Sequence, residues 1–182
     1  MLPNLTYIGN PILQKKAAPV TAIDDTILEI IEELKQAIAV HSTTIALAAP
    51  QFGHSLSLFV ARFPKIDPKT GASHTGEQYR VFINPKISDP SSETWVETEA
   101  SYSIPGIRLP IRRPVSITVS YQDESGTPHS ERLSGWPARI AMHENDLLNG
   151  TLFIFRADNR EKKRIAKDIE RLKEQHKEVT NS

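Results

Sequence analysis

Apolar residues recur with the period of an α-helix between residues 24 and 40. The apolar positions, spaced at i, i+4, i+7 and i+11, are Ile27, Ile31, Leu34 and Ile38. Glutamate and lysine occupy other positions of this segment, so the pattern predicts an amphipathic helix with one face in the core. Prolines at positions 3, 11 and 19 precede it and indicate an extended N-terminal arm.

A period of two is clearest in Val115–Tyr121, where apolar residues alternate with serine and threonine. This alternation predicts a strand with one buried face. Asp123–Gly126 has the composition of a turn, so Ser130–Leu133 is expected to return as the second strand of a hairpin. Three shorter runs also suit strands: Leu56–Ala61, Arg80–Asn84 and Trp95–Glu99.

Two further helices are expected near the end of the chain. Pro137–Asn149 begins with a proline and is followed by Gly150, which favours a helix stop. Asp158 and Glu161 resemble a capping box, which predicts a helix from residue 158 onward. Strands grouped between helices indicate an α+β fold. We expect one domain over residues 1–182, in which 158–182 form a C-terminal helix and tail, and a polar loop over 64–78.

Composition narrows the function classes. The chain has 182 residues, with 22 basic and 22 acidic side chains and no cysteine. The balanced charge argues against a dedicated nucleic-acid partner, and the missing thiols exclude disulfides and thiolate ligands. No apolar run approaches the roughly 18 residues of a membrane span, and no signal-like leader is visible, so we expect a cytoplasmic protein without a membrane partner.

The pair His143-Glu144 lies in the expected second helix. A helix carrying His-Glu-x-x-His presents two imidazoles one turn apart to a metal and a glutamate as general base. Here Leu147 stands at the second histidine position. Taken alone, such a pair most often has a structural or surface role.

Three segments together resemble the motifs of the peptide deformylase family. Thr44–Gln51 is similar to Gly-x-Gly-Leu-Ala-Ala-Pro-Gln, Glu99–Gly106 to Glu-Gly-Cys-Leu-Ser-x-Pro-Gly, and His143–Gly150 to His-Glu-x-Asp-His-Leu-x-Gly. The order and spacing match those of the family, and the resemblance extends from about residue 7 to about residue 156.

The resemblance implies the deformylase fold and removal of formate from N-formyl-methionine at the start of new chains. It implies that Fe(II) or Zn(II) is held by one cysteine and two histidines. By matching position, His143 is the first histidine ligand and Glu144 the proton-transferring glutamate. Gln51 and the backbone N–H of Tyr102 would hold the developing oxyanion.

Two of the three ligand positions depart from the family, since Ser101 replaces the cysteine and Leu147 the second histidine. A neutral hydroxyl is a poor ligand for such metals, and leucine has no donor atom. We therefore expect no cofactor and no deformylase activity, with a retained binding role toward N-terminal peptide ends of nascent chains or the ribosome. Two alternatives remain: an active deformylase with an atypical metal site, with His74 or His129 as a substitute ligand, and a metal-free hydrolase using Ser101 with His143 as base.

The substrate positions implied by the resemblance also carry changes. Thr44 and Ala46 replace family glycines on either side of Ile45, while Arg139 and Ile140 stand at methionine-pocket positions. Arg139 has three interpretations: it selects a polar or acidic first side chain, offsets Glu144, or extends to solvent. The motif acid Glu99 is anchored by an arginine in the family, and Arg113 is the best candidate here.

Overall fold

A computed structural model of the chain describes residues 4–40, 43–63, 65–66, 73–74 and 78–177. Its helices are η1 (Pro11–Gln14), α1 (Asp25–Val40), η2 (Ala49–Phe52), α2 (Gly135–Leu148), η3 (Phe153–Phe155) and α3 (Asn159–Lys177), where η marks short 3₁₀ turns. Its strands are β1 (Ala46–Ala48), β2 (Leu58–Ala61), β3 (Lys65–Ile66), β4 (Ser73–His74), β5 (Arg80–Ser88), β6 (Thr94–Ser101), β7 (Ile104–Pro114), β8 (Ser116–Gln122) and β9 (Pro128–Ser134).

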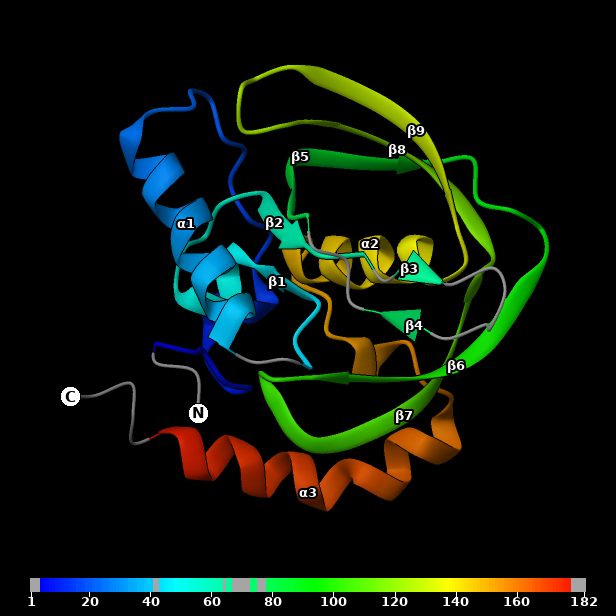
Figure 1. Ribbon diagram of the computed structural model, residues 1–182. Coiled ribbons are helices and arrows are strands. Elements are labelled where there is room, and N and C mark those ends of the chain that lie inside the picture. Colours follow the sequence, from blue (N-terminus) through cyan, green and yellow to red (C-terminus); the bar gives the residue numbers. More distant parts are fainter. Residues whose placement is uncertain (1–3, 41–42, 64, 67–72, 75–77, 178–182) are drawn as a thin grey trace.

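An antiparallel sheet of order β1-β2-β5-β8-β9 separates two apolar layers. Successive side chains of a strand point to opposite faces, and β2 is buried on both. Leu58 and Val60 pack with the apolar face of α1, whereas Phe59 and Ala61 belong to the cluster that contains α2. The sheet therefore has α1 on one face and α2 on the other (Figure 1).

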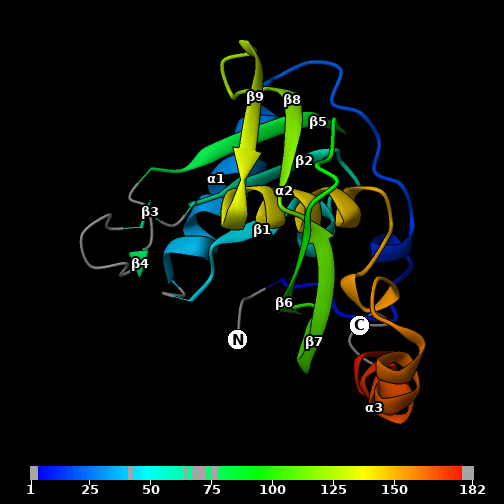
Figure 2. The ribbon, with the colours of Figure 1, turned by 90° about the vertical axis from the view of Figure 1, so that its right-hand side faces the viewer.

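A second, two-stranded sheet of β6 and β7 extends along the side of α2 away from the central sheet (Figures 1 and 2). Helix α3 packs beyond β7 and forms the outermost layer. Helix α2 is thus enclosed between two sheets. Edge strand β1 of the larger sheet and strand β6 of the smaller sheet line the same cavity.

The N-terminal arm runs back across the end of α2. The Ala17 N–H donates to the Leu148 carbonyl at 2.8 Å, and Ala18 forms a bridge with Leu56. Gly150 follows α2 with φ of +71°, and a Cβ there would lie 2.7 Å from the backbone of Gln14. Only glycine suits both the conformation and the close approach.

The α+β class and most expected elements are confirmed. The helix predicted over 24–40 spans Asp25–Val40, the hairpin joins β8 to β9, and Asp158 Oδ1 accepts from the Glu161 N–H at 2.8 Å at the start of α3. The largest omission is β7, whose alternating burial is interrupted in sequence by prolines that weaken a strand prediction. The expected loop over 64–78 contains β3 and β4, and its other residues from 64 to 77 lie outside the described residues.

Within the described part of the chain, none of the helices combines the length and the apolar character needed to cross a bilayer.

The Gly150 contact yields a stability prediction. Gly150→Ala should lower the free energy of unfolding by more than about 2 kcal/mol, because the new methyl group meets backbone and the residue has positive φ. Gly53→Ala is the matched control. Gly53 also has positive φ, at +81°, but nothing lies within 4 Å of the position that a Cβ would take, so only about 1–2 kcal/mol should be lost. Urea denaturation of the two variants measures both values, and equal losses would contradict the role of packing.

Candidate functional site

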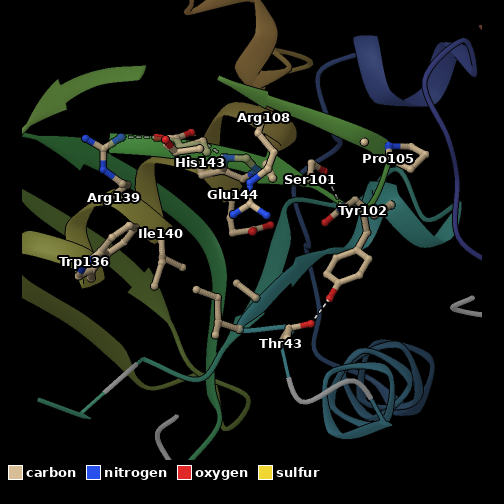
Figure 3. Close-up of a pocket in the computed structure, with 17 residues that line it drawn as sticks. Thr43, Ser101, Tyr102, Pro105, Arg108, Trp136, Arg139, Ile140, His143 and Glu144 are labelled. Carbon is tan, nitrogen blue, oxygen red and sulfur yellow. Dashed lines mark hydrogen bonds and ion pairs between the residues drawn. The ribbon is translucent and has the colours of Figure 1, made fainter. Parts of the chain in front are cut away.

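A cavity of about 640 Å³ lies between β1 and β6, with α2 along its base (Figure 3). Strand β1 contributes Ala46, the residue before it is Ile45, which also lines the cavity, and η2 contributes Gln51. The β6 side contributes residues 98–101 and Tyr102. Helix α2 contributes Trp136, Arg139, Ile140, His143 and Glu144. The structure thus brings most of the predicted site residues to one place.

The Glu99 carboxylate joins three of the elements around this cavity. Arg113 on β7 donates to it from Nε at 2.6 Å and from Nη2 at 2.9 Å, which confirms the expected pairing. Arg139 on α2 donates from Nη1 at 2.6 Å, and His143 Nδ1 lies 2.9 Å from the second carboxylate oxygen. One carboxylate is therefore shared by two guanidiniums and an imidazole.

These contacts fix the charge of Glu99 and the orientation of His143. Burial alone would raise the pKa of Glu99, but hydrogen bonds from Arg113 and His143 hold it at about 2. Burial alone would also lower the pKa of His143, yet the hydrogen bond to Glu99 and the charge of Glu144 raise it overall. Because Nδ1 is engaged with Glu99, Nε2 is the imidazole nitrogen left for chemistry in the cavity.

A second buried acid extends the same network. Arg113 also donates from Nη1 to Asp146 Oδ2 at 2.8 Å, and Arg156 donates to both oxygens of Asp146 at 3.1 and 2.5 Å. Asp146 was not among the residues expected at the site, although it lies one helical turn after His143. The available signal was the presence of an acid inside the third motif.

Glu144 is buried, with 5% of its surface exposed, and makes no hydrogen bond to the described residues. Its Oε2 atom is fully enclosed and has no partner in the described part of the chain. Burial raises the pKa of this carboxyl to about 7, partly opposed by the nearby His143. A carboxyl group with that pKa can take up or release a proton near neutral pH.

Gln51 and Ser101, which both line the cavity, contact each other. Gln51 Oε1 accepts from the Ala48 N–H at 2.9 Å, which orients the amide. Its Nε2 then donates to Ser103 Oγ at 3.1 Å and to Ser101 Oγ at 3.4 Å. The amide donor therefore points to the position where the resemblance places a metal ligand. Tyr102 follows Ser101, and the oxyanion role of its backbone N–H stays a prediction.

Arg139 departs from all three interpretations of its sequence position. Its side chain is 2% exposed, so it does not extend to solvent. Besides Glu99, it donates to the carbonyls of Ile111 and Trp95, both at 3.0 Å, and its guanidinium carbon lies 4.6 Å from the Trp95 ring centroid. The guanidinium therefore neutralises Glu99 rather than Glu144. Both of its terminal nitrogens are engaged within the protein, so its hydrogen-bonding groups are used in the wall of the cavity.

The three positions that match metal ligands differ in surroundings. Ser101 and His143 line the cavity, whereas Leu147 is 2% exposed within the apolar core. These positions offer one imidazole and one neutral hydroxyl, which does not fit a site built on three charged or imidazole donors. In the part of the chain that the structure describes, no group of three or more His, Cys, Asp or Glu side chains is placed to hold a metal ion.

The Ser101 hydrolase alternative lacks its central contact. A serine nucleophile needs a hydrogen bond to its base. Among the described residues, Ser101 Oγ bonds to Gln51 and to the Ser103 N–H, and no hydrogen bond joins it to His143. His129 is no substitute ligand, since it pairs with Asp123 at 2.6 Å in the β8–β9 hairpin. The side chain of His74 lies outside the described residues.

Known proteins are similar to this chain in both sequence and fold. A sequence model described as polypeptide deformylase matches residues 2–163. Peptide deformylases from Chlorobaculum parvum and Chlorobaculum tepidum are 35% and 36% identical over 174 residues, which cover 96% of this chain and 89% of each relative. A peptide deformylase structure from Plasmodium falciparum superposes with a TM-score of 0.84 at 30% identity, covering 98% of this chain and 99% of that one. One from Thermotoga maritima gives 0.74 at 35% identity, covering 85% and 96%.

These matches contradict the expectation of a protein without a cofactor. The matched family uses a metal, Fe(II) or Zn(II), so kinship with it implies a metal cofactor. The side chains at residues 101, 143 and 147 do not reproduce the ligand set that this cofactor has in the family, because Leu147 has no donor atom and Ser101 offers only a neutral hydroxyl. The expectation of no cofactor depended on those replacements alone, and replaced ligands change how a metal is held without establishing that none is used.

The buried carboxyl of Glu144 gives a pH-dependent prediction. Its pKa is raised from 4.5 to about 7 on folding, so ionisation opposes the folded state as the pH rises through this window. Glu144→Gln should therefore gain stability relative to the wild type between pH 4 and pH 8, by about 2–3 kcal/mol. Denaturant titrations with a chelator present measure the difference. The exposed Glu93→Gln is the control and should show no such trend; a flat difference for Glu144→Gln would refute the assigned burial effect.

Proposed function

Because this chain belongs to the peptide deformylase family, we propose that its cavity binds the N-terminal ends of peptide chains. We further propose that it removes an N-formyl group far more slowly than a deformylase with the full ligand set. The observation that carries this proposal is a formed cavity with a retained proton-transfer group, Glu144, beside ligand positions of which two are replaced.

Two edge strands support the binding of a peptide. β1 ends the central sheet and β6 ends the smaller one, and both line the cavity. Unpaired strand edges bind extended chains through main-chain hydrogen bonds. Ile45 and Ile140 add apolar surface for a first side chain, together with the aliphatic part of Arg139. A cavity of about 640 Å³ has the size of sites for small molecules and peptide ends.

The same cavity retains groups suited to an acyl substrate. Glu144 has a pKa of about 7, and a general base of this kind contributes roughly 10²–10⁴-fold to a rate. The Gln51 amide is oriented by the Ala48 N–H, which donates to its Oε1, so Nε2 points to Ser101, where a carbonyl oxygen of a substrate would need a donor. The Tyr102 backbone N–H is the second donor in this proposal.

The replaced ligands support slow turnover. When bound, a divalent metal acidifies water and polarises a carbonyl. His143 is the one conventional donor at the three positions, and Leu147 packs in the core. Loss of a group that merely supports a ligand costs about 10–100-fold in metal affinity or activity, so replacement of two ligands costs more.

The partner in this proposal is a nascent chain end, met free or at the ribosome. Such an encounter places the protein in the compartment of protein synthesis, in agreement with the cytoplasmic expectation. Nothing in the balanced composition, with 22 basic and 22 acidic residues, calls for direct binding of nucleic acid.

Activity measurements test the proposed slow turnover. With Fe(II), Co(II) or Zn(II) supplied anaerobically, kcat/KM for formyl-Met-Ala-Ser should lie at least about 10³-fold below that of an intact deformylase assayed in parallel. Binding of the same peptide, measured calorimetrically, should remain detectable. Turnover close to that of the intact enzyme, lost in Glu144→Ala, would instead establish an active deformylase with an atypical site.

Restoring the ligand set provides a second test. Ser101→Cys combined with Leu147→His should raise Co(II) affinity at least about 100-fold over wild type, because two new donors then converge with His143. Each single variant should gain much less. Competition titrations with circular dichroism as a check on folding, since Leu147 is a core residue, give the result. A folded double variant with wild-type affinity would mean that the three positions do not converge.

A further inference from the structure

A hydrogen bond between two side chains crosses the cavity near its surface. Thr43 Oγ1 and the Tyr102 hydroxyl lie 2.6 Å apart, although they are 59 residues apart in sequence. Both residues line the cavity, and Figure 3 shows the Tyr102 ring extending from the β6–β7 turn toward Thr43. We call this contact the Tyr102–Thr43 bridge.

The bridge joins the two walls between which a peptide would lie. Thr43 precedes β1 by three residues, and Tyr102 directly follows the last residue of β6. Ala46 on the first wall and Ala100 on the second line the same cavity. An extended chain between these edges therefore passes the bridge.

Both partners are accessible, so the contact can open. Tyr102 is 37% exposed, and Thr43 is also exposed. A hydrogen bond between such groups contributes about 0.5–1.5 kcal/mol net, which is about 2- to 10-fold in an equilibrium constant. This range suits a contact that selects among ligands without closing the cavity.

We propose that the Tyr102–Thr43 bridge is a specificity gate, which favours chain ends whose second and third residues are small. The inference rests on the proposed binding of peptide ends in this cavity. A bulky side chain near the bridge has to displace the Tyr102 ring and separate the two hydroxyls, whereas glycine, alanine or serine leaves the bridge intact. The preference that the gate sets adds to the affinity that the first side chain contributes beside Ile140 and Arg139.

The effect of the gate is measured as the ratio of the affinities for two peptides. Calorimetric Kd values for formyl-Met-Ala-Ser and formyl-Met-Phe-Phe give the preference of the wild type, expected to be at least about 10-fold for the small peptide. Tyr102→Phe and Thr43→Val each remove one hydroxyl of the bridge and should reduce this ratio by about 2- to 10-fold. Because the two variants break the same bond, the double variant should reduce it no further than either single one.

Two more variants separate the gate from a general disturbance of the cavity. Tyr102→Ala removes the ring as well and should reduce the preference most. Tyr79→Phe is the matched control, since Tyr79 does not line the cavity, and its ratio should equal that of the wild type. Peptides that bind with a ratio unchanged in all four bridge variants would overturn the gate while leaving the proposed function intact. Absence of binding in the wild type and in every variant would overturn both.

Discussion

A single buried carboxylate holds the β6 wall of the cavity to the helix at its base. Glu99 on β6 accepts hydrogen bonds from Arg113 on β7 and Arg139 on α2, and it orients His143 on the same helix. Burying charges is expensive unless they are paired and hydrogen-bonded, and removing one partner leaves the others uncompensated. The position of α2 relative to β6, and hence the shape of the cavity, depends on this carboxylate remaining ionised, which its pKa of about 2 ensures.

The ion-pair network also explains how an arginine is accommodated in the wall of an apolar pocket. Arg139 has four acceptors or ring contacts around it: Glu99, two backbone carbonyls and the Trp95 ring. The residue thus stabilises the β6–β7 sheet against α2, while its aliphatic part stays at the cavity. An arginine that the sequence places among expected ligand-binding positions therefore acts mainly on the packing of the cavity wall.

Sequence patterns predicted those helices and strands that depend on interactions between residues close in sequence. The period of the helix at 24–40, the alternation in Val115–Tyr121 and the cap at Asp158 each depend on residues close in sequence, and each is confirmed. The motifs also indicated the family and gathered most of the site. The partners of Arg139 could not be predicted, because Trp95, Glu99 and Ile111 are 28 to 44 residues away and are brought near only by β6–β7 pairing. Strand β7 was hidden by its prolines, and the Tyr102–Thr43 contact by a separation of 59 residues.

The close packing of Gly150 against Gln14 has a consequence for how the protein is made. The arm that contains Gln14 leaves the ribosome early, but the glycine that it packs against is synthesised 136 residues later, as the numbering shows. At about 5–20 residues per second, the arm waits several seconds or more for its partner. Contacts of such long range also slow folding in general. During vectorial synthesis, the apolar residues of the arm therefore stay without their native cover until the segment beyond α2 has emerged, and this interval is when a chaperone has most to bind.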